Sequence, residues 1–189
     1  MKIKYNAPIT LTFAIVSTVV FLVSRFLTGN LLIGSWFSVG GIGSFSFGSL
    51  QSWVTLFTYV LGHSSFEHLI GNLMLLLLLG PLLEQSYGEI NLLIMILITA
   101  LVAGVLNVLI FPTGLLGASG IVFMMILLAS FTNFGKGEVP LTFILVVLLW
   151  LGKEVWSALM PPNDNISQFA HIIGGFCGAL FGFLRPAKR

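Results

Sequence analysis

Long uninterrupted runs of apolar residues dominate the chain and set its expected architecture. A membrane-spanning helix needs about 20 predominantly apolar residues, and six segments approach that length. Their apolar character is continuous and does not alternate from residue to residue, so the pattern predicts helices and not the strands of a barrel. The predicted spans are 8–27, 65–83, 90–111, 116–132, 140–158 and 166–185. We therefore expect an all-α membrane protein with six transmembrane helices.

The stretch between the first two predicted spans has a different pattern. Residues 28–62 are apolar but are interrupted by glycines and serines, and their longest continuous piece, Ser49–Gly62, is too short to cross a bilayer. We interpret 28–62 as a long loop in the membrane interface and not as a seventh crossing. No internal repeat and no appended soluble domain is visible, so residues 1–189 are expected to form a single domain.

The composition strengthens this interpretation. Hydrophobic residues make up 57% of the chain and charged residues only 7%, whereas a soluble domain is about 25% charged. This composition excludes a soluble enzyme, a disordered chain and a nucleic-acid-binding protein. The single Cys177 excludes an internal disulfide and a cysteine-cluster metal site. We expect the lipid bilayer as surroundings, with no cofactor, no metal and no nucleic acid as partner.

The basic residues favour one orientation in the membrane. If six helices alternate in direction, six of the eight Lys and Arg residues fall on one side. The six are Lys2, Lys4, Lys136, Arg185, Lys188 and Arg189, and the other two are Arg25 and Lys153. Because cytoplasmic loops carry the excess of basic residues, this asymmetry predicts that both termini are cytoplasmic.

Local signals mark where some of these helices begin. Ser64-Ser65-Phe66-Glu67 has the pattern of a capping box, with Ser64 as the N-cap and Glu67 at the third helical position. Asn165–Gln168 has a similar pattern before the last span, and Pro112–Gly114 turns the chain between the third and fourth. The second, fourth and sixth predicted helices therefore begin at the outer surface and run inward.

Polar residues inside predicted spans are the candidates for function, because burying them in a membrane is costly. His68 and Asn72 lie in the second span, Ser119 in the fourth and His171 in the sixth. At about 1.5 Å per residue, all four fall within roughly 5–12 Å of the outer surface. Four polar side chains from three helices are thus expected to converge at one depth.

These residue types fit acyl-transfer chemistry. A serine becomes a nucleophile when a neighbouring base takes its proton, which makes Ser119 the candidate nucleophile and His171 the candidate base. No carboxylate lies at the depth of His171 within a span, so a dyad is expected in place of a triad. His68 and Asn72 lie on one helix face. Together with the backbone N–H of Ser119 they could donate to an oxyanion.

Close packing of the fourth and sixth helices is expected around this pair. Gly117, Ala118 and Gly120 leave the helix surface beside Ser119 nearly bare. Small residues recur every four positions in the sixth span, and such stripes let helix backbones approach closely in lipid. The residues of the stripe are Ala170, Gly174, Gly178 and Gly182.

Three motifs in the chain resemble those of the rhomboid family of intramembrane serine proteases. They are Gly117-Ala118-Ser119-Gly120, which looks like GxSG; His63, His68 and Asn72, which resemble HxxxxHxxxN; and Ala170, His171, Gly174 and Gly178, which are similar to AHxxGxxxG. The motifs occur in the family's order, and the likeness covers the whole chain as a minimal six-helix core.

The resemblance implies an activity and a location. It implies cleavage of transmembrane substrates near the outer membrane surface, with a mobile fifth helix and the loop above the site as a gate. We expect a multi-pass protein of a bacterial inner membrane whose site opens to the periplasmic or extracellular side. The chain departs from the family in lacking a Trp-Arg pair in the first loop. It also has Phe123 where many members have a tyrosine that packs against the base.

Alternatives remain open on the sequence alone. A catalytically silent rhomboid-like protein could bind or transport clients through the same cavity. His63 and His68 are five residues apart and do not share a helix face, so they do not form the start of a metal site. His63 is expected at the surface outside the helix, where it is either structural or without a role. Glu84 is expected to be a solvated cytoplasmic charge, or else to tie helix ends together, and Asn107 to bond another helix.

Overall fold

The described part of the chain is helical. A computed structural model describes residues 5–131, 141, 144–145, 148–149, 152 and 168–185. These residues form no strand, only an isolated antiparallel bridge between Val39 and Leu115, so the all-α prediction is confirmed for them. The elements are α1 (Pro8–Leu27), α2 (Leu31–Trp36), α3 (Leu50–Thr58), the 3₁₀ turn η1 (Tyr59–Leu61), α4 (Phe66–Tyr87), α5 (Glu89–Ile110), α6 (Ser119–Ser130) and α8 (Gln168–Leu184).

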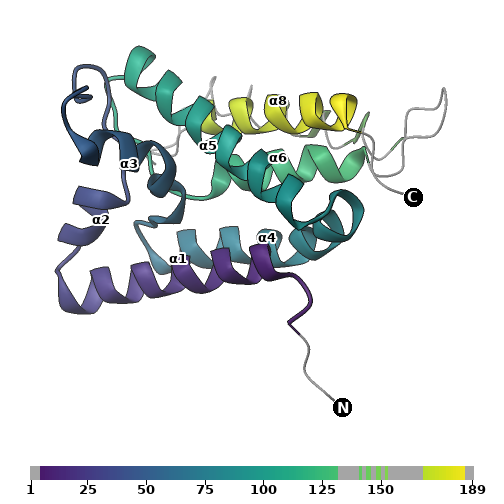
Figure 1. Ribbon diagram of the computed structural model, residues 1–189, viewed down its shortest axis with the longest axis horizontal. Helices are drawn as coiled ribbons and strands as arrows, with labels where there is room; N and C mark the ends of the chain where they lie inside the picture. Colours follow the sequence, from purple (N-terminus) through teal and green to yellow (C-terminus); the bar gives the residue numbers. More distant parts are fainter. Residues whose placement is uncertain are drawn as a thin grey trace.

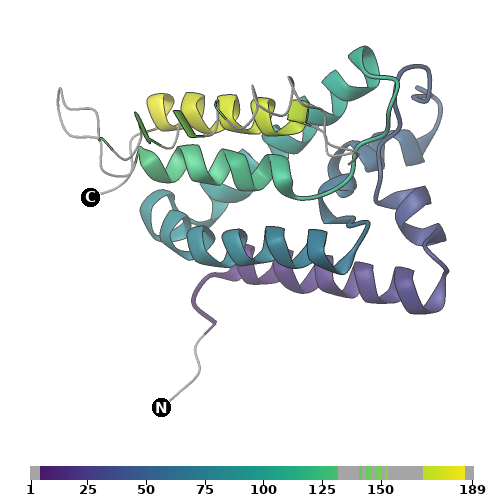
Figure 2. The same ribbon diagram turned by 180° about the vertical axis from the view of Figure 1, so that it is seen from behind.

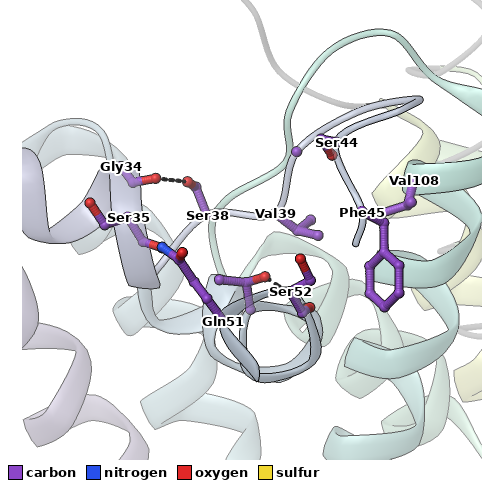
Figure 3. A pocket seen from close by; sticks show the side chains of 11 residues that line it. Gly34, Ser35, Ser38, Val39, Ser44, Phe45, Gln51, Ser52 and Val108 are labelled. Atoms are coloured by element: carbon purple, nitrogen blue, oxygen red, sulfur yellow. Dashed lines mark hydrogen bonds between the residues drawn. The ribbon is translucent and has the colours of Figure 1, made fainter. Parts of the chain in front are cut away.

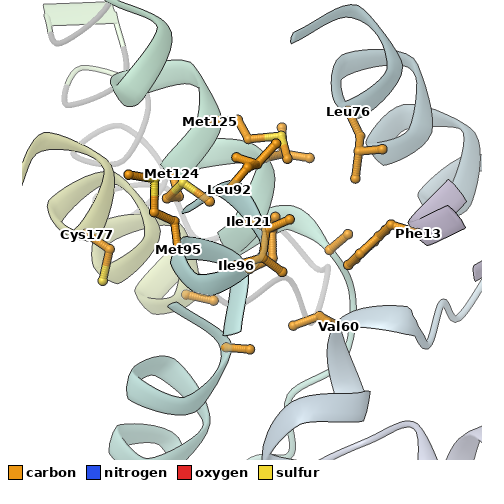
Figure 4. Packing of buried hydrophobic residues seen from close by; sticks show 14 of the residues in the cluster. Phe13, Val60, Leu76, Leu92, Met95, Ile96, Ile121, Met124, Met125 and Cys177 are labelled. Atoms are coloured by element: carbon orange, nitrogen blue, oxygen red, sulfur yellow. The ribbon is translucent and has the colours of Figure 1, made fainter. Parts of the chain in front are cut away.

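Helix α6 lies at the centre of the bundle. It packs against α4, α5 and α8, and α1 covers the far side of α4 (Figures 1 and 2). Ile121, Met124 and Leu128 of α6 are almost completely buried, and Met95 of α5 and Leu76 of α4 pack around them (Figure 4). A helix that is apolar on every side is expected in a buried position, which explains why the shortest of the long apolar segments is central.

The bundle has two ends of different composition. The first, here called the Glu84 end, joins the start of α1, the end of α4, the start of α5 and the end of α8 (Figure 1). There the Glu84 carboxylate accepts hydrogen bonds from the backbone N–H and the hydroxyl of Thr10, and Arg185 donates to Asn91. Glu84 is buried, so its interpretation as a solvated charge is wrong and the alternative, a tie between helix ends, holds.

The opposite end, here called the Ser119 end, carries the candidate residues. It joins the starts of α4, α6 and α8 and lies beside α2 and α3 (Figure 1). The three helices that begin there run in the same direction and α5 runs against them. Residues near the start of each helix therefore meet at one level of the bundle.

Within the described residues, three helices are long and apolar enough to cross a membrane: α1, α4 and α5. α1 has the same bounds as the first predicted span. The shorter apolar helices are α3 with η1, α6 and α8. α6 begins three residues later than the span predicted at 116–132, because Gly117 adopts φ +113°, which is incompatible with a helix. Most of the span predicted at 140–158, and most of the predicted cap at 165–168, lie outside the described residues.

The segment 28–62 contains helices, so its prediction as a continuous loop is wrong. α2 and α3 fold within it, and the Ser49 side chain caps α3 by accepting from the backbone N–H of Ser52. Serine is a favoured N-cap residue because its oxygen satisfies a free N–H of the first turn. α3 and η1 together are still too short to span a bilayer.

Candidate functional site

Ser119 is the first residue of α6. Ala118 is the N-cap and its side chain forms no cap hydrogen bond, and the preceding Gly117 has positive φ. The first N–H groups of a helix have no intrahelical acceptor and lie at the positive end of its dipole. The Ser119 hydroxyl, which is half-buried, therefore lies beside backbone donors that suit a developing negative charge.

The segment before Ser119 packs directly against α4. A Cβ at Gly117 would lie 2.7 Å from Cε1 and Nε2 of His68 and 3.9 Å from Nδ2 of Asn72. The Gly117 N–H donates to the carbonyl of Tyr59 at 2.9 Å. Both its positive φ and this close approach require glycine at position 117. The structure thus brings the His68 and Asn72 side chains next to the residues that lead into Ser119.

The two α4 side chains have different hydrogen-bond environments. Nδ1 of His68 lies 3.2 Å from the Ser64 hydroxyl. Asn72 is only 7% exposed, and its Nδ2 has no hydrogen-bond partner. A buried donor without a partner is rare in native proteins and requires an explanation. The position of this donor beside Gly117 is consistent with a group that binds a ligand atom.

The cap of α4 differs from the prediction by one residue. Ser65, and not Ser64, is the N-cap, and its hydroxyl accepts from the backbone N–H of His68 at 3.1 Å. Glu67 is therefore at the second helical position. The predicted capping box is wrong, because the extended backbone of Ser65 places its own hydroxyl over the first turn. Ser64 is thereby left to contact the imidazole of His68.

His171 lies across from the first turns of α6. Its ring stacks on Phe123 with centroids 4.3 Å apart and planes at 22°, and the residue is 4% exposed. Phe123 follows Ser119 by four residues, so the two side chains share a face of α6. The His171 ring is thus held one helical turn from Ser119 on that face.

Small residues allow α6 and α8 to approach at this level. A Cβ at Gly120 would lie 3.1 Å from the carbonyl oxygen of Ala170. A Cβ at Gly174 would clash with the Gly120 backbone, and one at Gly178 with the backbone of Met124. Close backbone contact of this kind is typical of helix pairs in lipid. It brings the helix that carries His171 against the start of α6.

His63 is buried, so its predicted surface position is wrong. It is 0% exposed, its Nδ1 lies 3.2 Å from the Leu61 carbonyl oxygen, and its ring meets that of His68 edge to face at 5.0 Å. Its Nε2 has no hydrogen-bond partner. Burial and the neighbouring His68 lower the pKa of His63 to about 4, which keeps its ring neutral. In the part of the chain that the structure describes, no three metal-ligating side chains lie together.

Sequence reasoning missed the contacts that hold the loop before α6. Val39 and Leu115 exchange backbone hydrogen bonds of 2.9 and 2.8 Å, and Ile42 donates to Phe111 at 2.8 Å. The Asn107 amide donates to the carbonyl oxygens of Gly40 and Thr113, so it bonds two loops and not another helix. A buried asparagine in an apolar helix was the available signal, but its partners are far away in sequence or follow the helix.

Comparisons with known proteins identify the family. Residues 50–188 match the family model described as Rhomboid domain. The chain is 28% identical over 170 residues to RHOMBOID-like protein 7 of Arabidopsis thaliana, covering 84% of this chain and 52% of the relative. It is 28% identical over 180 residues to Rhomboid protease GlpG of Pectobacterium atrosepticum, covering 93% of this chain and 62% of the relative.

A mammalian relative is similar at the same level. Rhomboid-related protein 2 of Mus musculus is 28% identical over 139 residues, which cover 67% of this chain and 46% of that protein. The chain thus spans about half the length of the curated relatives that it matches. Because the family model covers most of the sequence, this chain belongs to the rhomboid family.

Proposed function

We propose that the chain is an intramembrane serine endopeptidase that uses Ser119 as nucleophile and His171 as general base. The stacking of His171 on Phe123 carries this proposal, because Phe123 lies one turn after Ser119 on the same helix face. Membership of the rhomboid family, which includes a relative named as a protease, supports the same chemistry.

The proposed reaction proceeds in two steps. The Ser119 hydroxyl oxygen attacks the carbonyl carbon of a substrate peptide bond, and His171 takes the hydroxyl proton. His171 then gives that proton to the leaving amine as the C–N bond breaks, which leaves an acyl ester on Ser119. A water molecule, deprotonated by His171, attacks the ester carbon. The bond from that carbon to the Ser119 oxygen breaks, His171 returns the proton to that oxygen, and the new carboxyl end is released. Phe123 supports the imidazole through its face and supplies no proton.

Three donors are proposed to bind the oxyanion of the tetrahedral intermediate. They are the backbone N–H of Ser119, the side-chain amide of Asn72 and the ring N–H of His68. The Nδ2 of Asn72 is buried without a partner, so it needs no rearrangement before it donates. If the Ser64 hydroxyl donates to Nδ1 of His68, the ring proton is on Nε2, the atom that faces Gly117. Preorganised donors of this kind are worth about 3–4 kcal/mol each.

The proposal includes a membrane arrangement. Six spans with both termini in the cytoplasm would place the Ser119 end at the outer surface of a bacterial inner membrane. The three long apolar helices and the unequal distribution of Lys and Arg support this arrangement. The substrates would be transmembrane segments of other proteins, cleaved near that surface, because the candidate residues lie near the starts of α4, α6 and α8.

A reporter cleavage assay tests this function. Purified chain in lipid vesicles is mixed with a single-span reporter, and the fragments are identified by mass spectrometry. We expect wild type to cleave the reporter and Ser119→Ala to leave it intact. Ser130→Ala is the matched control, because Ser130 ends the same helix and its hydroxyl donates to the backbone carbonyl of Ile126 within that helix. No cleavage by folded wild type would favour a catalytically silent client-binding protein, whereas cleavage by Ser119→Ala would show that Ser119 is not the nucleophile.

A further inference from the structure

A polar cavity lies away from Ser119, between α2, α3 and the loop that joins them. Its volume is about 210 Å³, and Figure 3 shows side chains of both helices and of the loop around it. Its polar lining consists of Ser35, Ser38, Ser44, Gln51, Ser52 and Thr55. No charged side chain of the described residues lines this cavity. The cavity is therefore polar but electrically neutral.

An apolar groove adjoins the polar cavity. The groove has a volume of about 250 Å³ between α3 and α5, and Phe45 and Val108 line both spaces. Phe45, Phe47 and Trp53 pack edge to face along it, with Phe45 and Trp53 centroids 5.1 Å apart. Phe47 at its rim is 83% exposed. A neutral polar cavity thus continues into an apolar groove with an exposed rim.

The polar cavity offers both donors and acceptors. Hydroxyls of Ser38 and Ser44 donate to backbone carbonyls of Gly34 and Gly41, which leaves their oxygens free to accept. The Ser52 hydroxyl accepts from the N–H of Ser46, so its proton remains available. The side-chain N–H of Gln51 donates to the Ser35 carbonyl, so the side-chain oxygen of Gln51 remains available to accept. Such a mixture matches a ligand that both donates and accepts.

We propose that the cavity and groove bind one lipid with an uncharged polyol head group, such as a hexosyl diacylglycerol, with an acyl chain in the groove. A polyol presents both donors and acceptors, as the cavity does. A phosphate would call for donors and cations, and a quaternary ammonium for an aromatic cage or a carboxylate. This inference goes beyond the proposed protease activity, because the site is separate from Ser119.

The bound lipid would contact the loop that holds the segment before α6. Val39 lines the polar cavity and also exchanges two backbone hydrogen bonds with Leu115. A head group in the cavity therefore packs against the residue that anchors Leu115. We expect the amide hydrogens of Val39 and Leu115 to exchange more slowly when the lipid is bound, because the bridge opens less often.

Lipid retention in the full chain tests the proposal. The Ser119→Ala protein is used beside wild type, so that the result does not depend on proteolysis. Both are reconstituted in nanodiscs with equal amounts of hexosyl diacylglycerol, phosphatidylcholine and phosphatidylglycerol of matched chains, extracted into detergent, and measured by native mass spectrometry. We expect one hexosyl lipid per chain, retained about tenfold over the phospholipids, as one or two extra hydrogen bonds would give.

Two variants with matched controls locate the site. Gln51→Leu removes the amide from the polar cavity, and Leu109→Trp fills the rim of the groove. Each should abolish the roughly tenfold preference, whereas Gln85→Leu at the Glu84 end and Ile110→Trp, which line neither space, should keep it. Equal retention of the three lipids, preference for a phospholipid, or an unchanged preference in both variants would overturn the proposal. If the lipid did not change the amide hydrogen exchange of Val39 and Leu115, the proposed coupling between the lipid site and the segment before α6 would be wrong.

Discussion

Buried polar groups at the two ends of the bundle differ in whether they have hydrogen-bond partners. At the Glu84 end, the buried carboxylate accepts from the Thr10 N–H at 2.7 Å, from the Thr10 hydroxyl and from the Ile9 N–H at 3.3 Å. These donors are in the first turn of α1, where no intrahelical acceptor exists. The charge and the helix start therefore satisfy each other, which is the arrangement of a structural contact.

At the Ser119 end, polar atoms are buried without partners. Nδ2 of Asn72 and Nε2 of His63 are two of the three such atoms among the described residues, and the third is the Ser17 hydroxyl in the middle of α1. Each buried polar atom without a partner costs about 1–3 kcal/mol. The unpaired atoms of Asn72 and His63 lie at the same end of the bundle as Ser119. Their lack of protein partners leaves them available to bind a ligand. The comparison thus separates a structural polar cluster from the one that we propose to be functional.

Replacing the proposed base, His171, should give the largest effect. His171→Asn is expected to lower kcat about 10²–10⁴-fold, the usual contribution of a general acid–base residue, and to abolish the acidic limb of the pH–rate profile. Reporter cleavage at several pH values measures both. Glu67→Gln is the control, because a dyad needs no carboxylate. A loss of about a hundredfold or more in the control would instead indicate a triad.

Replacing the two buried asparagines, Asn72 and Asn107, should affect activity and stability in opposite ways. Asn72→Leu is expected to lower kcat about 10²–10³-fold at nearly constant KM and to raise the free energy of unfolding by up to about 1–3 kcal/mol, because the amide N–H that it removes is buried without a partner. Asn107→Leu leaves the carbonyls of Gly40 and Thr113 without their donor and should lower the free energy of unfolding by about 1–3 kcal/mol. Kinetics and thermal unfolding of both variants test this contrast, which fails if Asn72→Leu changes KM alone.

Acidification should destabilise the Ser119 end through His63. Its pKa is about 4 in the folded protein and 6.5 for an unperturbed histidine side chain, so the unfolded chain binds more protons between these values. The stability contributed by neutral His63 is fully present above pH 6.5 and is lost as pH falls to 4, by about 3 kcal/mol. Thermal unfolding across this range should show a shallower slope for His63→Gln. Identical slopes would mean that His63 titrates normally.

The smallest expected effect is at the Glu84 end and concerns stability alone. Glu84→Gln replaces an acceptor oxygen by a donor and should lower the free energy of unfolding by about 1–3 kcal/mol. The rate per folded molecule should stay unchanged. Glu89→Gln is the matched control, because Glu89 is exposed, and should change stability by less than about 0.5 kcal/mol. A Glu84→Gln protein that is stable but slow would contradict the separation of the two ends.

Local patterns were sufficient for much of the helical structure. The bounds of α1 follow from a run of apolar residues with Pro8 at its start, and the proximity of the three polar helix starts follows from their common direction. The stripe of small residues on α8 predicted its approach to α6, where Gly174 meets the backbone of Gly120. In each case the determining interaction lies within one helix or follows from its period.

Long-range contacts account for the errors. The burial of Glu84 depends on Thr10, 74 residues earlier. The late start of α6 depends on the positive φ of Gly117, which the contacts with His68 and Tyr59 impose. The identity of a single residue does not indicate which distant residues it will contact.

Covalent labelling of Ser119 tests the central claim most directly. A fluorophosphonate reacts only with a serine whose proton is removed by a nearby base. Wild type, Ser119→Ala, His171→Asn and the control Ser130→Ala are treated with the probe, and the modified residue is mapped by mass spectrometry. We predict labelling of Ser119 in wild type and in Ser130→Ala, and none in the other two variants. Labelling that persists in His171→Asn, or that maps to another serine, would contradict the proposed dyad.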